Sequence, residues 1–353
     1  MHDVLAEWRP AVDETIERIL PRELDEEHLA GFFGEPTYRY DAEAIQRALV
    51  DPIWDLLDRG GKRWRAVLFL LLVEAFGEAP EAYLEYACVP EILHNGTIIV
   101  DDVEDDADLR RGEPALHRIY GTDVALNAGN AMYFVPLKLV GRNPGDLDAA
   151  TRLRVYEMLM AELNRTHLGQ GMDIVWHNRR AVDATEEEYL EMCACKTGCL
   201  GRIVARLAAI VTGSEADEEH VARYAESMSV AFQIADDVLD VEYATERGGA
   251  FGKGAGNDVR EGKKTLMVIR AVRNGDPETA ARLDEILAAD ENTDEEVLEA
   301  VEILRSTGAV ESARGTAHEL AAEARDHLER ADIDPESAEP LTEFTRFVVD
   351  REV

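Results

Sequence analysis

HNGTIIVDDVEDDADLRRG, residues 94–112, joins an apolar run to a dense set of acids and then to two arginines. Asp101 and Asp105 belong to a DDxxD array, and residues four apart on a helix lie on one face. Like charges so placed repel each other, and a bound cation relieves that repulsion. A second array of the same form begins at Asp236, again directly after apolar residues. Two carboxylate faces, one with arginines beside it, predict a divalent-metal site for a polyphosphate.

The composition of the chain excludes several classes of partner. Of 353 residues, 73 are acidic and 37 are basic, which gives a formal net charge of −36. So acidic a chain repels nucleic acid and anionic membrane surfaces. The N-terminal stretch MHDVLAEWRPAVDETIERIL is acidic and amphipathic, unlike a signal peptide, and no apolar run is long enough for a transmembrane segment. We therefore expect a cytoplasmic protein.

Lysine is scarce in this chain. Six of the 37 basic residues are lysine and 31 are arginine, although lysine is normally among the commonest residues. Many acids with few lysines are typical of proteins from a salt-filled cytoplasm, where the Debye length is ~3 Å at 1 M salt. This pattern predicts a halophilic protein. Five of the six lysines lie inside the motifs described below.

Apolar residues recur at helical spacing along the chain, and no period-2 segment is long enough to predict a sheet. We predict an all-α fold of about a dozen helices in a single domain, 1–353, with a motif-bearing core at about 55–270 and acidic helices in 276–353. The helical segments that we expect are 1–32, 41–59, 62–76, 81–107 (where Pro90 either kinks the helix or marks its true start), 122–140, 147–172, 185–212, 215–243 and 265–273.

Three of the four cysteines, Cys193, Cys195 and Cys199, lie close together in the sequence. They lack CxxC spacing and a fourth ligand nearby, so a metal site is disfavoured. Their surroundings follow a helical apolar pattern, which predicts small buried thiols.

Basic residues at the start of a buried helix predict an anion site. Lys62 and Arg65, in GGKRWR, lie three residues apart where a helix N-terminus adds its positive dipole. Cations that merely cap a helix would favour the C-terminus. His94 precedes Asp101 by about two helical turns, so the two residues lie on one face of the helix. A lone histidine is more often a core residue, but this one shares its face with the predicted metal ligands.

Polar residues also interrupt two other apolar helices. Lys196 and Thr197 stand in an apolar pattern, and Gln233 precedes Asp236 by three residues. A buried lysine needs a partner, and a diphosphate would serve.

Together these motifs resemble the trans-isoprenyl diphosphate synthases, or polyprenyl synthetases, specifically the short-chain, geranylgeranyl type. Their order and separation match those of the family over about 55–270. Ala66, where the family usually has proline, and Asp106, an additional acid, depart from its pattern. The motifs that carry the resemblance are GGKRWR (60–65), HNGTIIVDDVEDDADLRRG (94–112), GQGMD (169–173), KTG (196–198), FQIADDVLD (232–240) and GKGAGNDVREGKKT (252–265).

The resemblance implies a single-domain isoprenoid-synthase bundle around a central cavity, a homodimer, and two or three Mg²⁺ ions. It implies isopentenyl diphosphate and an allylic diphosphate (dimethylallyl, geranyl or farnesyl) as substrates. On the matching positions it implies that Asp101, Asp105 and Asp236 bind Mg²⁺, that Arg110, Lys196, Thr197, Gln233, Lys253 and Lys263 line the allylic site, with Lys196, Thr197 and Gln233 as catalytic residues, and that Lys62, Arg65, His94 and Arg111 hold isopentenyl diphosphate.

The length of the product can be predicted from the helix that carries Asp101. One helical turn advances ~5.4 Å, close to one isoprene unit. Farnesyl-making relatives have bulky aromatics four or five residues before this aspartate, where Thr97 and Gly96 stand here. We therefore expect a C20 product, geranylgeranyl diphosphate, with C25 or a farnesyl product as alternatives, and we expect Gly96→Phe to shorten it.

Three other classes of protein share some of these features. A terpene cyclase shares the fold and the first acidic cluster but does not need Lys62, Arg65 and His94. A non-catalytic regulatory subunit of a synthase typically loses its acidic clusters, whereas both are intact here. An acidic Ca²⁺-binding protein would lack the arginines and lysines.

Overall fold

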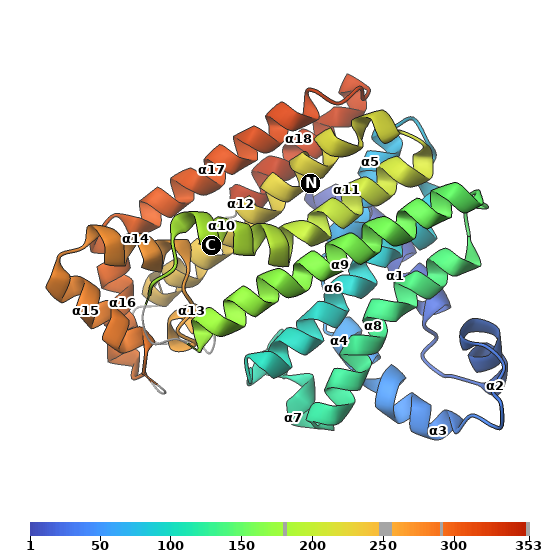
Figure 1. Cartoon of the computed structure of the whole chain (residues 1–353), viewed down its shortest axis with the longest axis horizontal. Coiled ribbons are helices and arrows are strands. Elements are labelled where there is room, and N and C mark those ends of the chain that lie inside the picture. The colour runs from blue at the N-terminus through green and yellow to red at the C-terminus, as the bar shows by residue number, and fades with distance from the viewer. Residues whose placement is uncertain (179–181, 247–255, 290–291, 351–353) are drawn as a thin grey trace. The chain divides into compact units, whose positions relative to one another are not determined.

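The computed structural model describes residues 1–178, 182–246, 256–289 and 292–350. Nearly all regular structure in these residues is helical (Figure 1), which confirms the predicted all-α fold. The chain divides into two compact units, which are described separately below. Unit 1 comprises Met1–Met160, Ile203–Glu218 and Ile333–Ala338, and unit 2 comprises Ala161–Arg202, Glu219–Asp332 and Glu339–Val353.

The prediction of one helix over residues 1–32 is wrong. Helix α1 (His2–Ile19) ends just before Pro21, because proline disfavours helical backbone in the residue that precedes it. A new start follows at Asp25, whose carboxylate accepts a hydrogen bond from the His28 N–H at 2.7 Å. This N-cap opens α2 (Glu26–His28), which continues into the π-helix η1 (Leu29–Phe33).

Unit 1 is built on three helices: α5 (Trp64–Ala75), α6 (Leu84–Glu104) and α8 (Thr122–Arg142). Helix α5 is apolar on nearly all sides, and Glu74 is its one residue that is not buried. Helix α6 packs along α8 (Figure 1). Pro90 lies inside α6 and does not mark its start.

The crossing of α6 on α8 depends on small residues. A Cβ at Gly96 would lie 2.8 Å from the Met132 Cβ and 3.0 Å from the Gly129 carbonyl oxygen. A Cβ at Gly129 would lie 2.9 Å from Val100. The two glycines therefore let the helix backbones approach closely, and neither position faces open space.

In unit 2 the prediction of a helix start near Thr185 is confirmed. The Thr185 hydroxyl accepts the Glu188 N–H, and the Glu188 carboxylate accepts the Thr185 N–H, a capping box. This start opens α10 (Glu186–Cys193), which continues through the π-helix η4 (Ala194–Gly198) into α11 (Cys199–Thr212). Single π-helical turns are frequent at functional sites.

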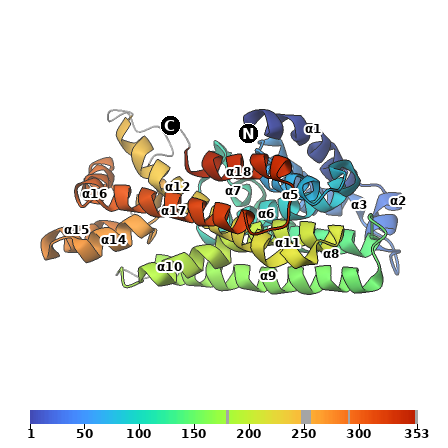
Figure 2. The ribbon, with the colours of Figure 1, turned by 90° about the horizontal axis from the view of Figure 1, so that it is seen from above.

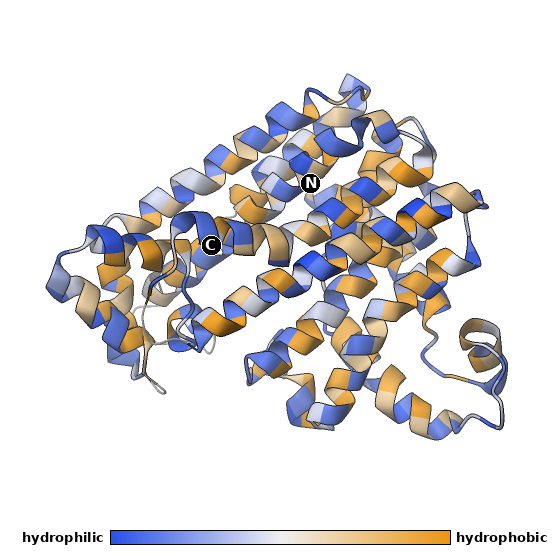
Figure 3. Cartoon of the chain, in the orientation of Figure 1, coloured by the Kyte–Doolittle hydropathy of each residue, from blue (hydrophilic) through white to orange (hydrophobic). Residues whose placement is uncertain are grey.

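The C-terminal helices of unit 2 form a further group. In two views (Figures 1 and 2), α14 (Leu266–Asn274), α15 (Pro277–Leu287), α16 (Asp294–Ser306) and α17 (Ala309–Leu328) lie side by side. Hydrophilic and hydrophobic residues alternate along these helices (Figure 3), and their apolar faces pack together. The remaining elements are α3 (Ala42–Ile45), η2 (Gln46–Val50), α4 (Asp51–Asp58), η3 (Pro80–Tyr83), β1 (Leu109–Arg110), β2 (Glu113–Pro114), α7 (Leu116–Tyr120), α9 (Ala149–His177), η5 (Glu215–Asp217), α12 (Glu218–Glu246), α13 (Asn257–Arg260) and α18 (Pro335–Val349).

Two expectations about side chains and membranes can be compared with the described residues. All four cysteines, Cys88, Cys193, Cys195 and Cys199, are free and buried, as predicted for the last three. In the same part of the chain, none of the helices combines the length and hydropathy needed to cross a bilayer.

Candidate active site

The first acidic cluster occupies the C-terminal end of α6. The Asp105 N–H donates to the Asp101 carbonyl at 2.9 Å, so these residues lie one helical turn apart on one face, as predicted. Both are half-buried. Asp102 between them is 2% exposed, and the Arg110 Nε donates to its Oδ1 at 2.8 Å. Burial raises the pKa of Asp102, and Arg110 opposes this rise.

A short hairpin after α6 directs Arg111 back toward the loop before α5. Strand β1 pairs antiparallel with β2, and Arg111 between them adopts φ 55°. The Arg111 Nη1 donates to the carbonyls of Leu56 at 3.1 Å and of Gly60. Arg111 therefore lies beside the GGKRWR motif, and the structure brings these two predicted acceptor-site elements together.

His94 lies among arginines in unit 1. Desolvation of its half-buried imidazole lowers its pKa well below the usual value, and four neighbouring arginines lower it further. The imidazole is therefore neutral at physiological pH. The four guanidinium groups belong to Arg65, Arg111, Arg110 and Arg63. A concentration of cations in a chain of net charge −36 favours an anionic ligand.

The predicted anion site at the N-terminus of α5 requires a correction. The Glu91 carboxylate accepts the Arg65 N–H at 3.1 Å and the Ala66 N–H at 3.5 Å. A carboxylate of the protein therefore occupies the terminus that we expected to face a ligand. Arg65 is 4% exposed, and its guanidinium lies 4.2 Å from the centroid of the Trp64 ring, whereas Lys62 is exposed.

The second acidic cluster lies on α12. Asp236 is exposed, and Asp237 is 7% exposed, with hydrogen bonds from Tyr189 and Gln233. Burial raises the pKa of Asp237 well above the usual value, and the charge of Asp258 adds to this rise.

The last carboxylate of this cluster has a structural partner. Asp240 accepts the backbone N–H groups of Asn257 at 3.2 Å and Asp258 at 3.1 Å, at the start of α13. Burial and the neighbouring Asp258 charge raise the pKa of Asp240 to about 7.

Two lysines that follow the second cluster in the sequence have different surroundings. The Lys263 Nζ lies 2.8 Å from a Glu261 oxygen and 3.3 Å from an Asp258 oxygen. Lys264, its neighbour, is buried, and desolvation lowers its pKa. Lys253, which the resemblance assigns to the allylic site, lies outside the described residues.

The π-helix η4 carries the next pair of predicted residues. The Lys196 Nζ lies 2.5 Å from an Asp173 oxygen, and the Thr197 hydroxyl donates to the Gln233 Oε1 at 3.1 Å. A Cβ at Gly169 would lie 2.9 Å from the Cys195 Cβ and closer still to the Lys196 amide nitrogen. Gly169 and Asp173 of the GQGMD motif thus position η4 and its lysine.

Three residues of these surroundings were not found from the sequence. Glu91 and Arg63 have no pattern that would single them out. Tyr189 had a usable signal, because it precedes Lys196 by seven residues, two helical turns, and therefore belongs to the same helix face.

The comparisons with known proteins add a decisive observation. The sequence profile described as Polyprenyl synthetase matches residues 46–304, more than half of the chain. The chain belongs to the polyprenyl synthetase family. It is therefore a trans-prenyltransferase of isoprenoid biosynthesis with the helical isoprenyl synthase fold.

Three relatives illustrate the position of this polyprenyl synthetase within the family. It is 34% identical over 298 residues to the short chain isoprenyl diphosphate synthase of Methanothermobacter thermautotrophicus, with 84% of this chain and 88% of the relative covered. It is 31% identical over 316 residues to the geranylfarnesyl diphosphate synthase of Natronomonas pharaonis, with the same coverages. The solved geranylgeranyl pyrophosphate synthetase of Geoglobus acetivorans superposes with a TM-score of 0.81 at 28% identity, over 99% of this chain and 100% of that chain.

The aspartates of this polyprenyl synthetase fit a shared metal ion better than a closed metal cage. Among the described residues, no three His, Cys, Asp or Glu side chains converge to hold an ion by themselves. Mg²⁺ usually keeps several waters and takes one or two carboxylates plus substrate phosphates. The pair Asp101 and Asp105, and the exposed Asp236, suit that arrangement.

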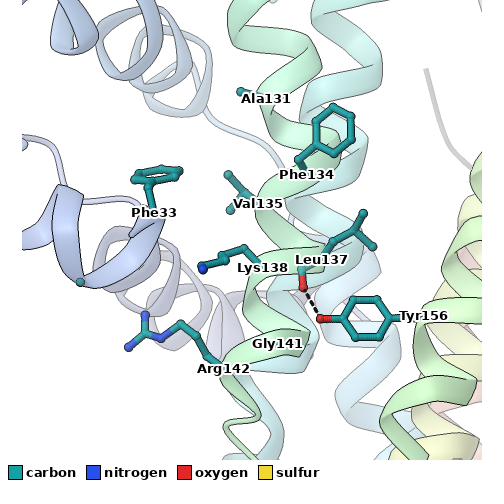
Figure 4. Close-up of a pocket in the computed structure, with 10 residues that line it drawn as sticks. Phe33, Ala131, Phe134, Val135, Leu137, Lys138, Gly141, Arg142 and Tyr156 are labelled. Atoms are coloured by element: carbon teal, nitrogen blue, oxygen red, sulfur yellow. Dashed lines mark hydrogen bonds between the residues drawn. The ribbon is translucent and has the colours of Figure 1, made fainter. Parts of the chain in front are cut away.

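A cavity of about 720 Å³ in unit 1 involves none of the predicted site residues (Figure 4). Phe33, Phe134 and Val135 supply apolar walls, and the Tyr156 hydroxyl donates to the Leu137 carbonyl at 3.0 Å. The cavity lies between η1 and α8, and we do not include it in the candidate active site.

Proposed function

We propose that this polyprenyl synthetase condenses isopentenyl diphosphate head-to-tail with an allylic diphosphate. The allylic carbon–oxygen bond breaks with its electron pair on the leaving diphosphate, the double bond of isopentenyl diphosphate attacks the allylic carbon, and the released diphosphate takes the proton that is lost. The observation that carries the proposal is that each DDxxD cluster has a cation near it. In unit 1 Arg110 donates to Asp102, and in unit 2 the charge of Lys263, which pairs with Asp258, acts on Asp237 and Asp240.

The cationic group of unit 1 supports an acceptor site. We assign Lys62, Arg65, His94 and Arg111 to the diphosphate of isopentenyl diphosphate. Guanidinium groups match phosphate oxygens with two parallel donors each, and the neutral His94 donates one hydrogen bond without adding charge. Because Glu91 covers the N-terminus of α5, side chains and not the helix dipole would bind this diphosphate.

The second set of residues supports a donor site. We assign Arg110, Lys196, Thr197, Gln233, Lys253 and Lys263 to the allylic diphosphate, and Asp101, Asp105 and Asp236 to two or three Mg²⁺ ions. When bound, Mg²⁺ supplies positive charge that stabilises the leaving diphosphate. Lys196, oriented by Asp173, adds a cation whose position is fixed in advance. Apolar walls would keep water from the reacting carbon.

We propose geranylgeranyl diphosphate, C20, as the product. The presence of both geranylgeranyl and geranylfarnesyl synthases among the relatives supports a C20 or C25 chain. The part of the length argument that rests on Gly96 requires correction, because a side chain there would strike α8. Thr97 is the better probe, since it is half-buried and its hydroxyl bonds only to the His94 carbonyl of its own helix.

A direct assay tests the reaction and the product length together. The purified protein is incubated in high salt with Mg²⁺, isopentenyl diphosphate and each allylic starter in turn, and the products are sized. We expect a C20 product, shortened by Thr97→Phe; C20 from the variant would contradict the proposed path of the growing chain. No condensation with any starter would contradict the function and favour a regulatory subunit.

A homodimer is part of this proposal. Exposed apolar side chains on unit 1 support it: Phe134 on α8 is 67% exposed, and Leu153 and Met160 on α9 are 57% and 54% exposed. Large exposed apolar patches mark interaction surfaces. Light scattering in high salt should give twice the mass of one chain, and a monomer would contradict this part.

A further inference from the structure

A buried hydrogen-bonded chain in unit 2 connects Tyr189 to Thr197. The Tyr189 hydroxyl donates to Asp237 Oδ2 at 2.8 Å, and Gln233 Nε2 donates to Asp237 Oδ1 at 2.9 Å. The Thr197 hydroxyl donates to Gln233 Oε1 at 3.1 Å. These hydrogen bonds join three elements, α10, α12 and η4. Tyr189 is only 2% exposed, so it cannot itself contact a substrate in this structure.

Each of these hydrogen bonds has one direction in the structure. Both oxygens of Asp237 accept a hydrogen bond in this structure, one from Tyr189 and one from Gln233, so the Gln233 amide turns its nitrogen toward Asp237. Its carbonyl oxygen then faces Thr197, and the Thr197 hydroxyl must give its single hydrogen to that oxygen. Only the lone pairs of the Thr197 hydroxyl oxygen then stay available for a further hydrogen bond.

Tyr189 is the donor that completes this arrangement. A phenol has one hydrogen, and a carboxylate is a stronger acceptor than a thiol, so this hydrogen goes to Asp237 although the Cys193 thiol also contacts the hydroxyl. Without it, Asp237 Oδ2 would be a buried acceptor lacking a donor. The Gln233 amide would then no longer be restricted to one orientation, and the Thr197 hydrogen could turn elsewhere.

We propose that Tyr189 is a positioning residue that, through Asp237 and Gln233, makes Thr197 a hydrogen-bond acceptor toward the allylic site. The proposal rests on the proposed function, because it assigns a direction to a residue of that site. Lone pairs are unfavourable beside a diphosphate oxygen and favourable beside positive charge. The allylic carbon acquires positive charge as its bond to diphosphate breaks, so the orientation of Thr197 affects the transition state more than substrate binding.

The main test compares two tyrosines of unit 2. Tyr224, like Tyr189, is fully buried, and its hydroxyl donates to the Leu341 carbonyl at 2.8 Å, outside the chain of bonds that ends at Thr197. We expect Tyr189→Phe to lower kcat about tenfold, the effect of one lost buried hydrogen bond, with KM for the allylic substrate nearly unchanged. Tyr224→Phe should keep the kcat of the wild type at a similar loss of thermal stability. Equal kcat values for the two variants would overturn the proposal.

A double-mutant cycle separates positioning from general structural damage. Thr197→Val removes the hydroxyl at nearly constant shape, whereas Thr197→Ser keeps it. If Tyr189 acts through Thr197, Tyr189→Phe should lower kcat much less in the Thr197→Val variant than in the wild type. Additive effects would overturn the proposal.

The serine variant provides a test even if Tyr189→Phe does not fold. It should keep kcat near that of the wild type, whereas Thr197→Val should lower it about tenfold; equal kcat values for the two would contradict an acceptor role. A wild-type protein that forms no product with any starter would contradict the proposed function itself, which is a different result.

Discussion

In the first acidic cluster the middle carboxylate, Asp102, is neutralised by the guanidinium of Arg110, whereas in the second the middle carboxylate, Asp237, is held by two neutral donors, Tyr189 and Gln233. The last positions differ as well. Asp105 ends α6 half-buried, but Asp240 accepts two backbone N–H groups of α13. The same DDxxD pattern therefore has different partners in the two units.

The difference teaches which carboxylates each unit can offer to a ligand. In unit 1, Asp101 and Asp105 lie on one face while Asp102 is taken up by Arg110. In unit 2, Asp236 is the one exposed aspartate of the cluster, whereas Asp237 and Asp240 are less exposed and accept hydrogen bonds from the protein. The assignment of Asp101, Asp105 and Asp236 to Mg²⁺ is our proposal, and the substitutions below test it.

The largest expected effect concerns a carboxylate assigned to the substrate. We predict that Asp101→Asn lowers kcat by about 10²–10³-fold, because a preorganised charge at the leaving group is lost. Asp106→Asn is the matched control, since Asp106 is an exposed neighbour that pairs with Arg118. Steady-state kinetics of both variants checks this, and a mild defect in Asp101→Asn would remove the distinction between the two positions.

The next prediction compares the two middle carboxylates. Asp102→Asn should lower the free energy of unfolding by about 1–3 kcal/mol, because it leaves the Arg110 charge without its partner. Asp237→Asn should change stability less, because its two hydrogen-bond donors, Tyr189 and Gln233, are neutral and the substitution removes an ionisable group from a buried site near Asp258. Urea denaturation measures both values. Equal losses would mean that the partners of the two carboxylates do not determine their energetic roles.

A pair of glycines tests how unit 2 positions its lysine. Gly169→Ala should cost about 1–3 kcal/mol of stability and lower kcat, because the new methyl group would push η4 and Lys196 away from α9. Gly171→Ala, two residues along the same helix, has open space around its Cβ and should be neutral or slightly stabilising. Thermal melts and kinetics check both; similar behaviour of the two variants would contradict the close packing.

The sequence predicted part of this arrangement and missed the rest for identifiable reasons. Helical spacing placed Asp101 and Asp105 on one face, and an acidic first turn located the start of α10 at Thr185. The role of Glu91 was hidden, because it depends on α6 packing against the start of α5, which no local pattern encodes. Gly96 was misread as open space, because a glycine can equally permit a tunnel or a close helix crossing.

The smallest expected effect is a pH dependence of stability that arises from the burial of His94 and from the cations around it. The pKa of His94 in the folded protein lies well below its unfolded value of about 6.5. Below pH 6.5 the unfolded chain therefore binds a proton that the folded chain does not, and the free energy of unfolding falls as pH falls. The contribution is fully present above pH 6.5. His94→Gln should remove a slope of at most about 1.4 kcal/mol per pH unit between pH 5 and about 6.5.

Urea denaturation of wild type and His94→Gln at several pH values measures this slope, and parallel curves would show that burial and the neighbouring arginines do not lower the pKa of His94. Inorganic pyrophosphate extends the comparison between the units. If the anion binds among these arginines, it offsets their charge, raises the pKa of His94 and flattens the wild-type slope. The Asp102→Asn and Asp237→Asn variants locate this effect. Asp102→Asn removes a negative charge beside Arg110 and should strengthen pyrophosphate binding in unit 1. Asp237→Asn changes the acceptor of two donors in unit 2 and should leave the His94 slope as it is in the wild type.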